Sequence, residues 1–269
     1  MKIRLGTKDD IVSLKKLWIE CFSDSEEYIE QYFKYRFPQS FPIILEENRE
    51  VLGMVHLIPC QLAAHQGNQK AFYWYAAGIA KKARKKGLFQ FLVSTVIKGT
   101  QNHGYQNLCV PVKHLFNFYQ KNGFCNPYYT KDYYFNSEIL KKCDISNYFS
   151  ENNAKNYFKN NWSIGSVIWN DDDIHYGILE NQICGGEPVS FYINNQEYFA
   201  CCTKKDDTLI LEHTNLMPDT INCIGNNLLE RFQVSSLILR KTGTPDGTAF
   251  ALCDSDLVTY NSTFDFSLS

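Results

Sequence analysis

The densest group of side chains that could do chemistry lies between residues 80 and 89. Five of the six residues in Lys81–Lys86 are lysine or arginine, and Gly87 follows them. The pattern predicts a strand before this run and a helix that begins at Gly87. A helix N-terminus carries unpaired N–H groups and the positive end of the helix dipole, so it stabilises a phosphate group. The glycine lets backbone come close to a ligand. Together these features predict a site for a polyanion.

The basic run also has two plainer interpretations, a solvated turn and a nucleic-acid surface. The whole chain has 27 basic and 29 acidic residues, a net charge of −2. Without the five cations of Lys81–Lys86 it has 22 basic and 29 acidic residues, a net charge of −7. A chain so acidic elsewhere binds nucleic acid poorly. We therefore favour a small anionic ligand and expect no nucleic-acid partner.

A second segment that could do chemistry contains Tyr119. The segment reads Phe118-Tyr119-Gln120-Lys121-Asn122-Gly123-Phe124 and follows a short predicted strand over Leu108–Pro111. A half-buried tyrosine on a helix is commonly structural. Its hydroxyl can also donate a proton to a leaving group. The residues alone leave both interpretations of Tyr119 open.

These two segments resemble the GCN5-related N-acetyltransferase (GNAT) family. The family signature Arg/Gln-x-x-Gly-x-Gly/Ala corresponds to Arg84-Lys85-Lys86-Gly87-Leu88-Phe89, and a later feature, Tyr-x-x-x-Gly-Phe, corresponds to Tyr119–Phe124. The resemblance covers roughly residues 3–135. It implies a GNAT-like acyl-CoA N-acyltransferase fold, of the two-domain bacterial type with a degenerate GNAT-like second half.

The resemblance also implies a cosubstrate and a reaction. Loop amides would hold the pyrophosphate of acetyl-CoA, and the preceding strand would pair its backbone with the pantetheine arm. Tyr119 would be the catalytic acid that protonates the departing thiolate, after direct attack of a primary amine on the thioester. No metal is implied. The residues assigned to the cofactor are Ile79, Ala80, Lys81, Arg84, Lys85, Lys86, Gly87, Leu88 and Phe89.

Four positions depart from the family pattern. Phe89 stands where a small residue is usual, and Lys81 replaces a proline. Val112 replaces an asparagine, and the strand Phe72–Ala80 lacks the carboxylate that many members use as a base. These departures support an alternative function, a catalytically silent CoA-binding protein whose second half binds a protein partner.

The general base is not identified by the sequence. Side-chain candidates are His56, His114, Glu46 and Glu47. The C-terminal carboxylate of Ser269 is another, because the aromatic tail Phe264–Ser269 would suit burial. The amine could also lose its proton to water.

The hydrophobic pattern predicts a mixed α/β fold for residues 1–135. Strands joined by tight turns should be antiparallel and strands separated by helices parallel, which gives a mixed sheet with helices on both faces. Helices are predicted over residues 11–22, 25–37, 87–104 and 113–122, and strands over residues 2–5, 43–46, 51–60, 71–80, 107–111 and 128–135. We expect this part to be the acetyl-CoA-binding domain.

Residues 136–269 predict a second, acidic α/β domain. Its strand, hairpin, helix and strand follow one another as in the first domain, which would suit a degenerate repeat. Helices are predicted over Ile139–Tyr157 and Pro218–Phe232, and strands over Ile174–Leu179, Val189–Ile193, Tyr198–Thr203, Leu209–His213, Ser236–Arg240 and Phe250–Cys253. The acidic run Asp171–Asp173 is more typical of a solvated turn than of a calcium or amine site.

Composition excludes several classes of protein. Apolar residues make up 44% of the chain and aromatic residues 15%, which excludes disorder and collagen-like repeats. No apolar run is long enough to span a membrane, and the first residues lack the pattern of a signal peptide, so we expect a cytoplasmic protein with no membrane partner. Ten cysteines without a C-x-x-C pair predict buried thiols rather than a metal site.

The charge is unevenly distributed along the chain. Residues 1–130 have 17 basic and 10 acidic side chains, a net charge of +7, whereas residues 131–269 have 10 and 19, a net charge of −9. A basic first half suits anionic coenzyme A, and an acidic second half suits a cationic acceptor such as a polyamine, an aminoglycoside or a basic peptide. No heptad or interface stripe indicates an oligomeric state.

Overall fold

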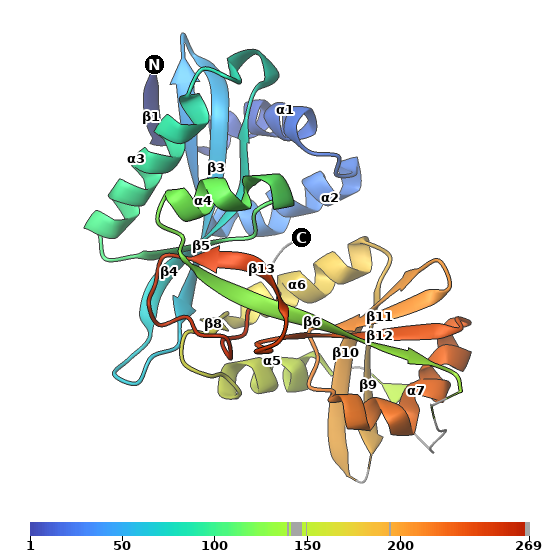
Figure 1. The fold of residues 1–269 in the computed structure, drawn as a ribbon. Helices are drawn as coiled ribbons and strands as arrows, with labels where there is room; N and C mark the ends of the chain where they lie inside the picture. Colours follow the sequence, from blue (N-terminus) through green and yellow to red (C-terminus); the bar gives the residue numbers. More distant parts are fainter. Residues whose placement is uncertain (139, 141–146, 149, 194, 267–269) are drawn as a thin grey trace. The chain divides into compact units, whose positions relative to one another are not determined.

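The computed structural model describes residues 1–138, 140, 147, 148, 150–193 and 195–266. It is a mixed α/β structure that divides into two compact units (Figure 1). The first unit contains residues 1–127 together with residues 250–259, and the second contains residues 128–249 and 260–266. The first unit therefore includes a segment from the second half of the chain.

The first unit is built on a mixed sheet. Its strands are β1 (Lys2–Leu5), β2 (Phe41–Glu47), β3 (Glu50–Leu62), β4 (Gln69–Ile79), β5 (Gln106–Cys109) and β13 (Thr248–Cys253), which neighbour one another in that order. Among the described strand pairs of this unit, only β4 and β5 run parallel, and the helix α3 (Leu88–Asn102) connects them. The other pairs are antiparallel, including β5 with β13. The predicted mixed α/β fold is confirmed.

Helices cover both faces of this sheet. Neighbouring side chains of β4 point to opposite faces, so each face can be followed through the helix that they contact. Tyr75 packs under α1 (Ile11–Cys21), where its ring lies 5.6 Å from that of Trp18. Trp74 points to the other face, toward Phe124 after α4 (Phe116–Lys121), with ring centroids 5.3 Å apart. The helix α2 (Glu26–Gln31) lies on the α1 side, where the Tyr28 hydroxyl hydrogen-bonds to that of Tyr75.

A buried asparagine holds the returning segment of residues 250–259 in the first unit. Asn107 is fully buried, and its side-chain oxygen accepts hydrogen bonds from Trp74 Nε1 at 2.9 Å and Thr100 Oγ1 at 2.8 Å. Its side-chain nitrogen donates to Asp254 at 2.8 Å, and its backbone N–H donates to the same carboxylate. One side chain thus joins β4, β5, α3 and the segment after β13.

The second unit has its own mixed sheet. The strands, in order of contact, are β6 (Asn126–Asn136), β12 (Ser236–Thr242), β11 (Thr208–Glu212), β10 (Gln196–Lys205), β9 (Glu187–Ile193) and β7 (Asn147–Tyr148). In the part of this unit that the structure describes, only β11 and β12 are parallel, and the helix α7 (Pro218–Phe232) connects them. The arrangement of β10, β11, α7 and β12 therefore has the same order and directions as β3, β4, α3 and β5.

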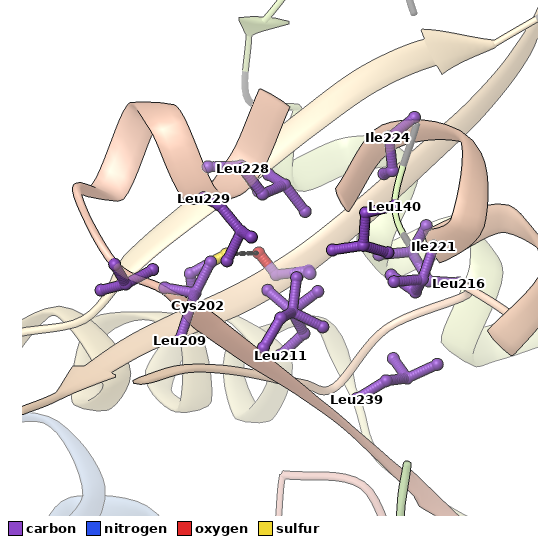
Figure 2. Close-up of a cluster of buried hydrophobic side chains, with 14 of the residues drawn as sticks. Leu140, Cys202, Leu209, Leu211, Leu216, Ile221, Ile224, Leu228, Leu229 and Leu239 are labelled. Carbon is purple, nitrogen blue, oxygen red and sulfur yellow. Dashed lines mark hydrogen bonds between the residues drawn. The ribbon is translucent and has the colours of Figure 1, made fainter. Parts of the chain in front are cut away.

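A hydrophobic cluster fixes α7 on its sheet, as Figure 2 shows. Apolar residues recur along α7 at helical spacing, and Ile221, Ile224 and Leu228 meet Leu209 and Leu211 of β11 in this cluster. The helix α6 (Asp171–Ile183) contacts β9 and β10, and α5 (Glu151–Asn160) packs against α6. No helix among the described residues is long and apolar enough to cross a membrane.

The structure corrects one predicted strand. Residues Ile174–Leu179 lie inside α6 and are helical. The helix begins because the Asn170 side chain accepts from the Asp173 N–H at 2.9 Å and the Asp173 carboxylate accepts from the Asn170 N–H at 3.1 Å. The acidic run Asp171–Asp173 is therefore the first turn of a helix, where negative charge is stabilised by the helix dipole. It is not a turn before a strand.

Most other predicted elements are present. The helix predicted over Pro218–Phe232 has those bounds, and the strands near residues 2, 51, 71 and 198 lie within a few residues of their expected limits. The helix predicted over Ile139–Tyr157 is present only from Glu151, and residues 139, 141–146 and 149 lie outside the described residues. The sequence predicted a division after residue 135, whereas the compact units divide after residue 127.

Removing the Asn107 side chain should destabilise the first unit. Asn107→Ala leaves the buried Trp74 N–H without its acceptor and removes the side-chain donor to Asp254, so we expect the free energy of unfolding to fall by about 2–4 kcal/mol. Urea unfolding measures the change. Asn68→Ala removes an exposed side-chain hydrogen bond and serves as the control, with an expected change below about 0.5 kcal/mol. Equal losses in the two variants would contradict this account.

Candidate active site

The first unit contains a gap in its sheet where β4 and β5 part. The parallel pairing runs from Ala71 opposite Gln106 to Trp74 opposite Cys109. There β5 ends, whereas β4 continues to Ile79. The edge of β4 after Trp74 has therefore lost its neighbour on that side. A strand edge of this kind presents unpaired N–H and C=O groups to a ligand.

A β-bulge distorts β4 at the start of this gap. His56 of β3 pairs with Tyr75, but Met54 pairs with Gly78, so one residue of β3 faces two residues of β4, Ala76 and Ala77. Ala76 has a positive φ of 48°. Between Ala71 and Ala80, only Ala76 and Ala77 are more than slightly exposed. Bulges often stand beside active sites because they redirect backbone groups.

The predicted polyanion loop follows β4 directly. Lys85 and Gly87 both have left-handed backbone, with φ of 61° and 73°, and Gly87 is the residue before α3. Alternation of right- and left-handed residues gathers successive N–H groups into a concave site for an anion. Within α3 the first regular hydrogen bond runs from Phe91 N–H to Gly87 O at 3.0 Å, so the N–H groups before it lack helical partners.

The charges of this loop face solvent. Lys81, Lys85 and Lys86 are exposed, and Lys82 pairs with Glu50 of β3. Phe89, which departs from the family signature, packs against two aromatic side chains of α4. Its ring stacks on Phe118 of α4 at 5.2 Å and meets the edge of Tyr119 at 6.3 Å. The bulky residue thus links α3 to α4.

Tyr119 lies close to the end of β5. Its side chain is 4% exposed and packs against Phe124, with ring centroids 5.4 Å apart. Burial raises the pKa of the Tyr119 hydroxyl, and the nearby Cys109 thiol raises it further. Tyr119 is therefore a protonated donor at neutral pH. Cys109 ends β5, so this hydroxyl lies beside the point where the two strands part.

The edge of β4 beside the gap is occupied by Arg84, which the sequence singled out, and by Glu20 and Cys21, which it did not. Ile79 O accepts hydrogen bonds from Arg84 Nε at 3.0 Å and from the Cys21 thiol at 3.5 Å. The Lys81 N–H donates to the Glu20 carboxylate. Glu20 and Cys21 end α1, about sixty residues away in the sequence, so no local motif could reveal them.

The candidate bases are dispersed. His56 is fully buried among aromatic rings, its Nδ1 lies 2.7 Å from the Tyr32 hydroxyl, and burial lowers its pKa to about 3. Glu46 is held by Arg4 Nε at 2.7 Å and by Lys2. His114 and Glu47 are exposed. Ser269 lies outside the described residues. Among the described residues, no three histidine, cysteine, aspartate or glutamate side chains gather as they would to hold a metal ion.

The predicted cofactor residues thus form one continuous strand, loop and helix start, and Tyr119 adjoins them through Phe89. Residues 2–125 match the family described as an acetyltransferase (GNAT) domain. The match assigns residues 2–125 to the GNAT acetyltransferase family, and it spans the first unit apart from its returning segment. No curated protein matches the chain in sequence.

Solved structures resemble both units of the chain. A probable N-acyltransferase from Enterococcus faecalis V583 superposes with a TM-score of 0.77 at 11% identity, covering 94% of this chain and 72% of that one. Eis1 from Mycobacterium abscessus gives 0.65 at 9% identity, with 94% and 73% covered. A GCN5-related N-acetyltransferase from Anabaena variabilis gives 0.66 at 13%, with 94% and 71% covered. At these identities the likeness concerns the fold.

Substituting Gly87 should impair anion binding at the loop. A β-branched side chain disfavours positive φ, so Gly87→Val should reorient the N–H groups and weaken the binding of inorganic pyrophosphate about tenfold or more. Gly104→Val is the control, because Gly104 has a φ of 75° and, like Gly87, has no atom within 4 Å of an added Cβ. Calorimetric titration at low salt measures both. Equal weakening in both variants would argue against an anion site at Gly87.

Proposed function

We propose that the protein transfers an acetyl group from acetyl-CoA to a primary amine. The observation that supports this most directly is the gap between β4 and β5, which leads into the basic loop and the start of α3. The gap leaves one edge of β4 without a neighbouring strand, and a pantetheine arm offers amide groups that can pair with a strand edge. The loop N–H groups and the exposed Lys85 and Lys86 suit a diphosphate.

The reaction would occur where β4 bulges. The neutral amine nitrogen forms a bond to the acetyl carbon and the carbon–sulfur bond breaks. The nitrogen loses a proton to water as it becomes an amide, and the thiolate receives a proton from a donor that then regains one from water. A backbone N–H that the bulge frees from β3 would stabilise the negative charge that develops on the thioester oxygen. Most of the rate enhancement would come from holding both reactants in line.

Tyr119 is the proposed donor of that proton. Its raised pKa keeps the hydroxyl protonated, and it adjoins Cys109 at the mouth of the gap. Burial raises the pKa of the Cys109 thiol as well, so this cysteine is a poor nucleophile at neutral pH. That favours direct attack by the amine over transfer through an acetylated cysteine.

A cationic acceptor is the proposed substrate class. The segment that leads into α2 exposes three carboxylates, those of Asp24, Glu26 and Glu27. It is tied to β4 by the hydrogen bond between the Tyr28 and Tyr75 hydroxyls, and Tyr75 is the residue before the bulge. Carboxylates so placed would attract a polyamine, an aminoglycoside or a basic peptide. We propose no nucleic-acid or membrane partner.

The alternative is a silent CoA-binding protein. It is favoured by the lack of any carboxylate in Phe72–Ala80, because the buried His56 and the ion-paired Glu46 leave the described part of the active site without an evident base. Loss of the ammonium proton to water before attack would remove this objection. Turnover therefore decides between the two functions.

Turnover of acetyl-CoA with a panel of amines tests the proposal. We expect micromolar binding of acetyl-CoA by calorimetry, and thiol release that is about tenfold faster in kcat/KM with a triamine than with an amino acid of net negative charge. The preference should shrink as salt increases, because charges on the surface are screened. Binding without thiol release would favour the silent protein, and absence of binding would exclude both functions.

Replacing Tyr119 by phenylalanine tests the proton donor. Tyr119→Phe keeps the ring contacts with Phe89 and Phe124 but removes the hydroxyl, so kcat should fall about a hundredfold while the dissociation constant of acetyl-CoA changes less than about twofold. Tyr134→Phe, at a side chain that is 74% exposed in the second unit, is the control and should leave kcat unchanged. An unchanged kcat in Tyr119→Phe would assign the tyrosine a structural role.

A further inference from the structure

The edge of β4 that faces the gap carries its own side-chain partners. Ala80 N–H bonds back to Leu52 O of β3 at 2.9 Å, so Ala80 faces β3. Successive residues of a strand direct their backbone groups to opposite sides, so Ile79 O faces the gap. The Lys81 N–H follows where β4 gives way to the short 3₁₀ helix Lys81–Ala83. Arg84 donates to the first of these groups, and Glu20 accepts from the second.

These two side chains reproduce the hydrogen-bonding pattern of an amide-containing arm. A secondary amide offers one N–H donor and one C=O acceptor, which is what a strand edge requires from its neighbour. Here the guanidinium of Arg84 supplies the donor, and the carboxylate of Glu20 supplies the acceptor. Both bonds involve an ionised group and are correspondingly strong.

The end of α1 is built to reach this edge. Gly78 lies under it, and a Cβ at that position would come within 2.9 Å of Cys21 Sγ. The Cys21 thiol also donates to Ile79 O at 3.5 Å and lies 3.9 Å from Arg84 Nη2. The close approach that glycine permits brings Glu20, the preceding residue, to the Lys81 N–H.

We propose that Glu20 is an internal competitor of the cofactor, which must be displaced before the pantetheine arm can pair with β4. This inference rests on the proposed use of acetyl-CoA and concerns the affinity of that same site. When a site is partly occupied by the protein itself, the apparent dissociation constant of the ligand rises by the reciprocal of the free fraction. Glu20 therefore sets how much cofactor is needed to fill the gap.

Glu20→Ala should tighten the binding of acetyl-CoA. If the edge is free for about a tenth to a third of the time, removing the carboxylate lowers the dissociation constant about three- to tenfold. Glu20→Gln keeps a side-chain oxygen that accepts from Lys81 N–H, so its dissociation constant should stay nearer the wild-type value. Asp9→Ala removes one exposed negative charge elsewhere in the first unit and should change binding less than twofold.

Calorimetry of the full chain measures these constants, and the amide resonance of Lys81 reports the contact without ligand. In the free protein Glu20→Ala should shift that resonance, whereas Asp9→Ala should not. Weaker or unchanged acetyl-CoA binding in Glu20→Ala, with the unfolding temperature preserved, would overturn the proposal. A gain in Glu20→Gln equal to that in Glu20→Ala would also overturn it, since charge repulsion alone would then explain the effect.

The wild-type titration separates this inference from the proposed function. If the wild-type chain and Glu20→Ala both bind no acetyl-CoA, the proposed function fails and this inference fails with it. If the wild-type chain binds and the two Glu20 variants do not differ from it, the function stands and only the competition by Glu20 is rejected.

Discussion

The first unit is governed by one requirement, that a strand which has lost its neighbour must still satisfy its backbone groups. β4 continues past the end of β5, and polar main-chain groups near a protein interior are costly when unpaired. The chain meets this requirement in two ways at once. A bulge turns part of the strand toward solvent at Ala76, and side chains from α1 and from the loop cover what remains. The same requirement makes the gap receptive to a ligand that resembles a strand.

The second unit has the same arrangement of strands and helix, but its parallel strands stay paired. β11 and β12 pair along Thr208–Leu211, nearly the whole length of β11, so they leave no comparable gap. The turn that follows, from His213 to Met217, has no glycine and no lysine or arginine, and α7 begins with a proline that lacks an N–H group. Two arrangements of strands and helix with the same directions therefore differ at the turn that the proposed function assigns to the anion. The difference comes from a few residues at one turn.

Much of the fold and part of the site could be predicted from the sequence. Periodic apolar residues predicted the bounds of α7. The run Lys81–Lys86 with Gly87 predicted the loop, because the residues that define it are neighbours in the sequence. Local signals misled at Ile174–Leu179, where apolar residues resembled a strand although Asn170 and Asp173 cap a helix. The bulge at Ala76 could not be predicted because no glycine stands at the residue with positive φ. Glu20 could not be predicted because it accepts a hydrogen bond from a residue about sixty positions later in the sequence. These features depend on how distant strands and helices meet, which spacing along the chain does not encode.

The return of residues 250–259 to the first unit has a consequence for synthesis on the ribosome. The sheet of the first unit is complete only when β13 pairs with β5, and β13 ends at Cys253. Asp254, which follows it, fastens that strand to the buried Asn107. The chain must therefore be made at least as far as Cys253 before β13 can join the sheet of the first unit. A nonsense codon late in the reading frame would damage a site whose own residues were all translated long before.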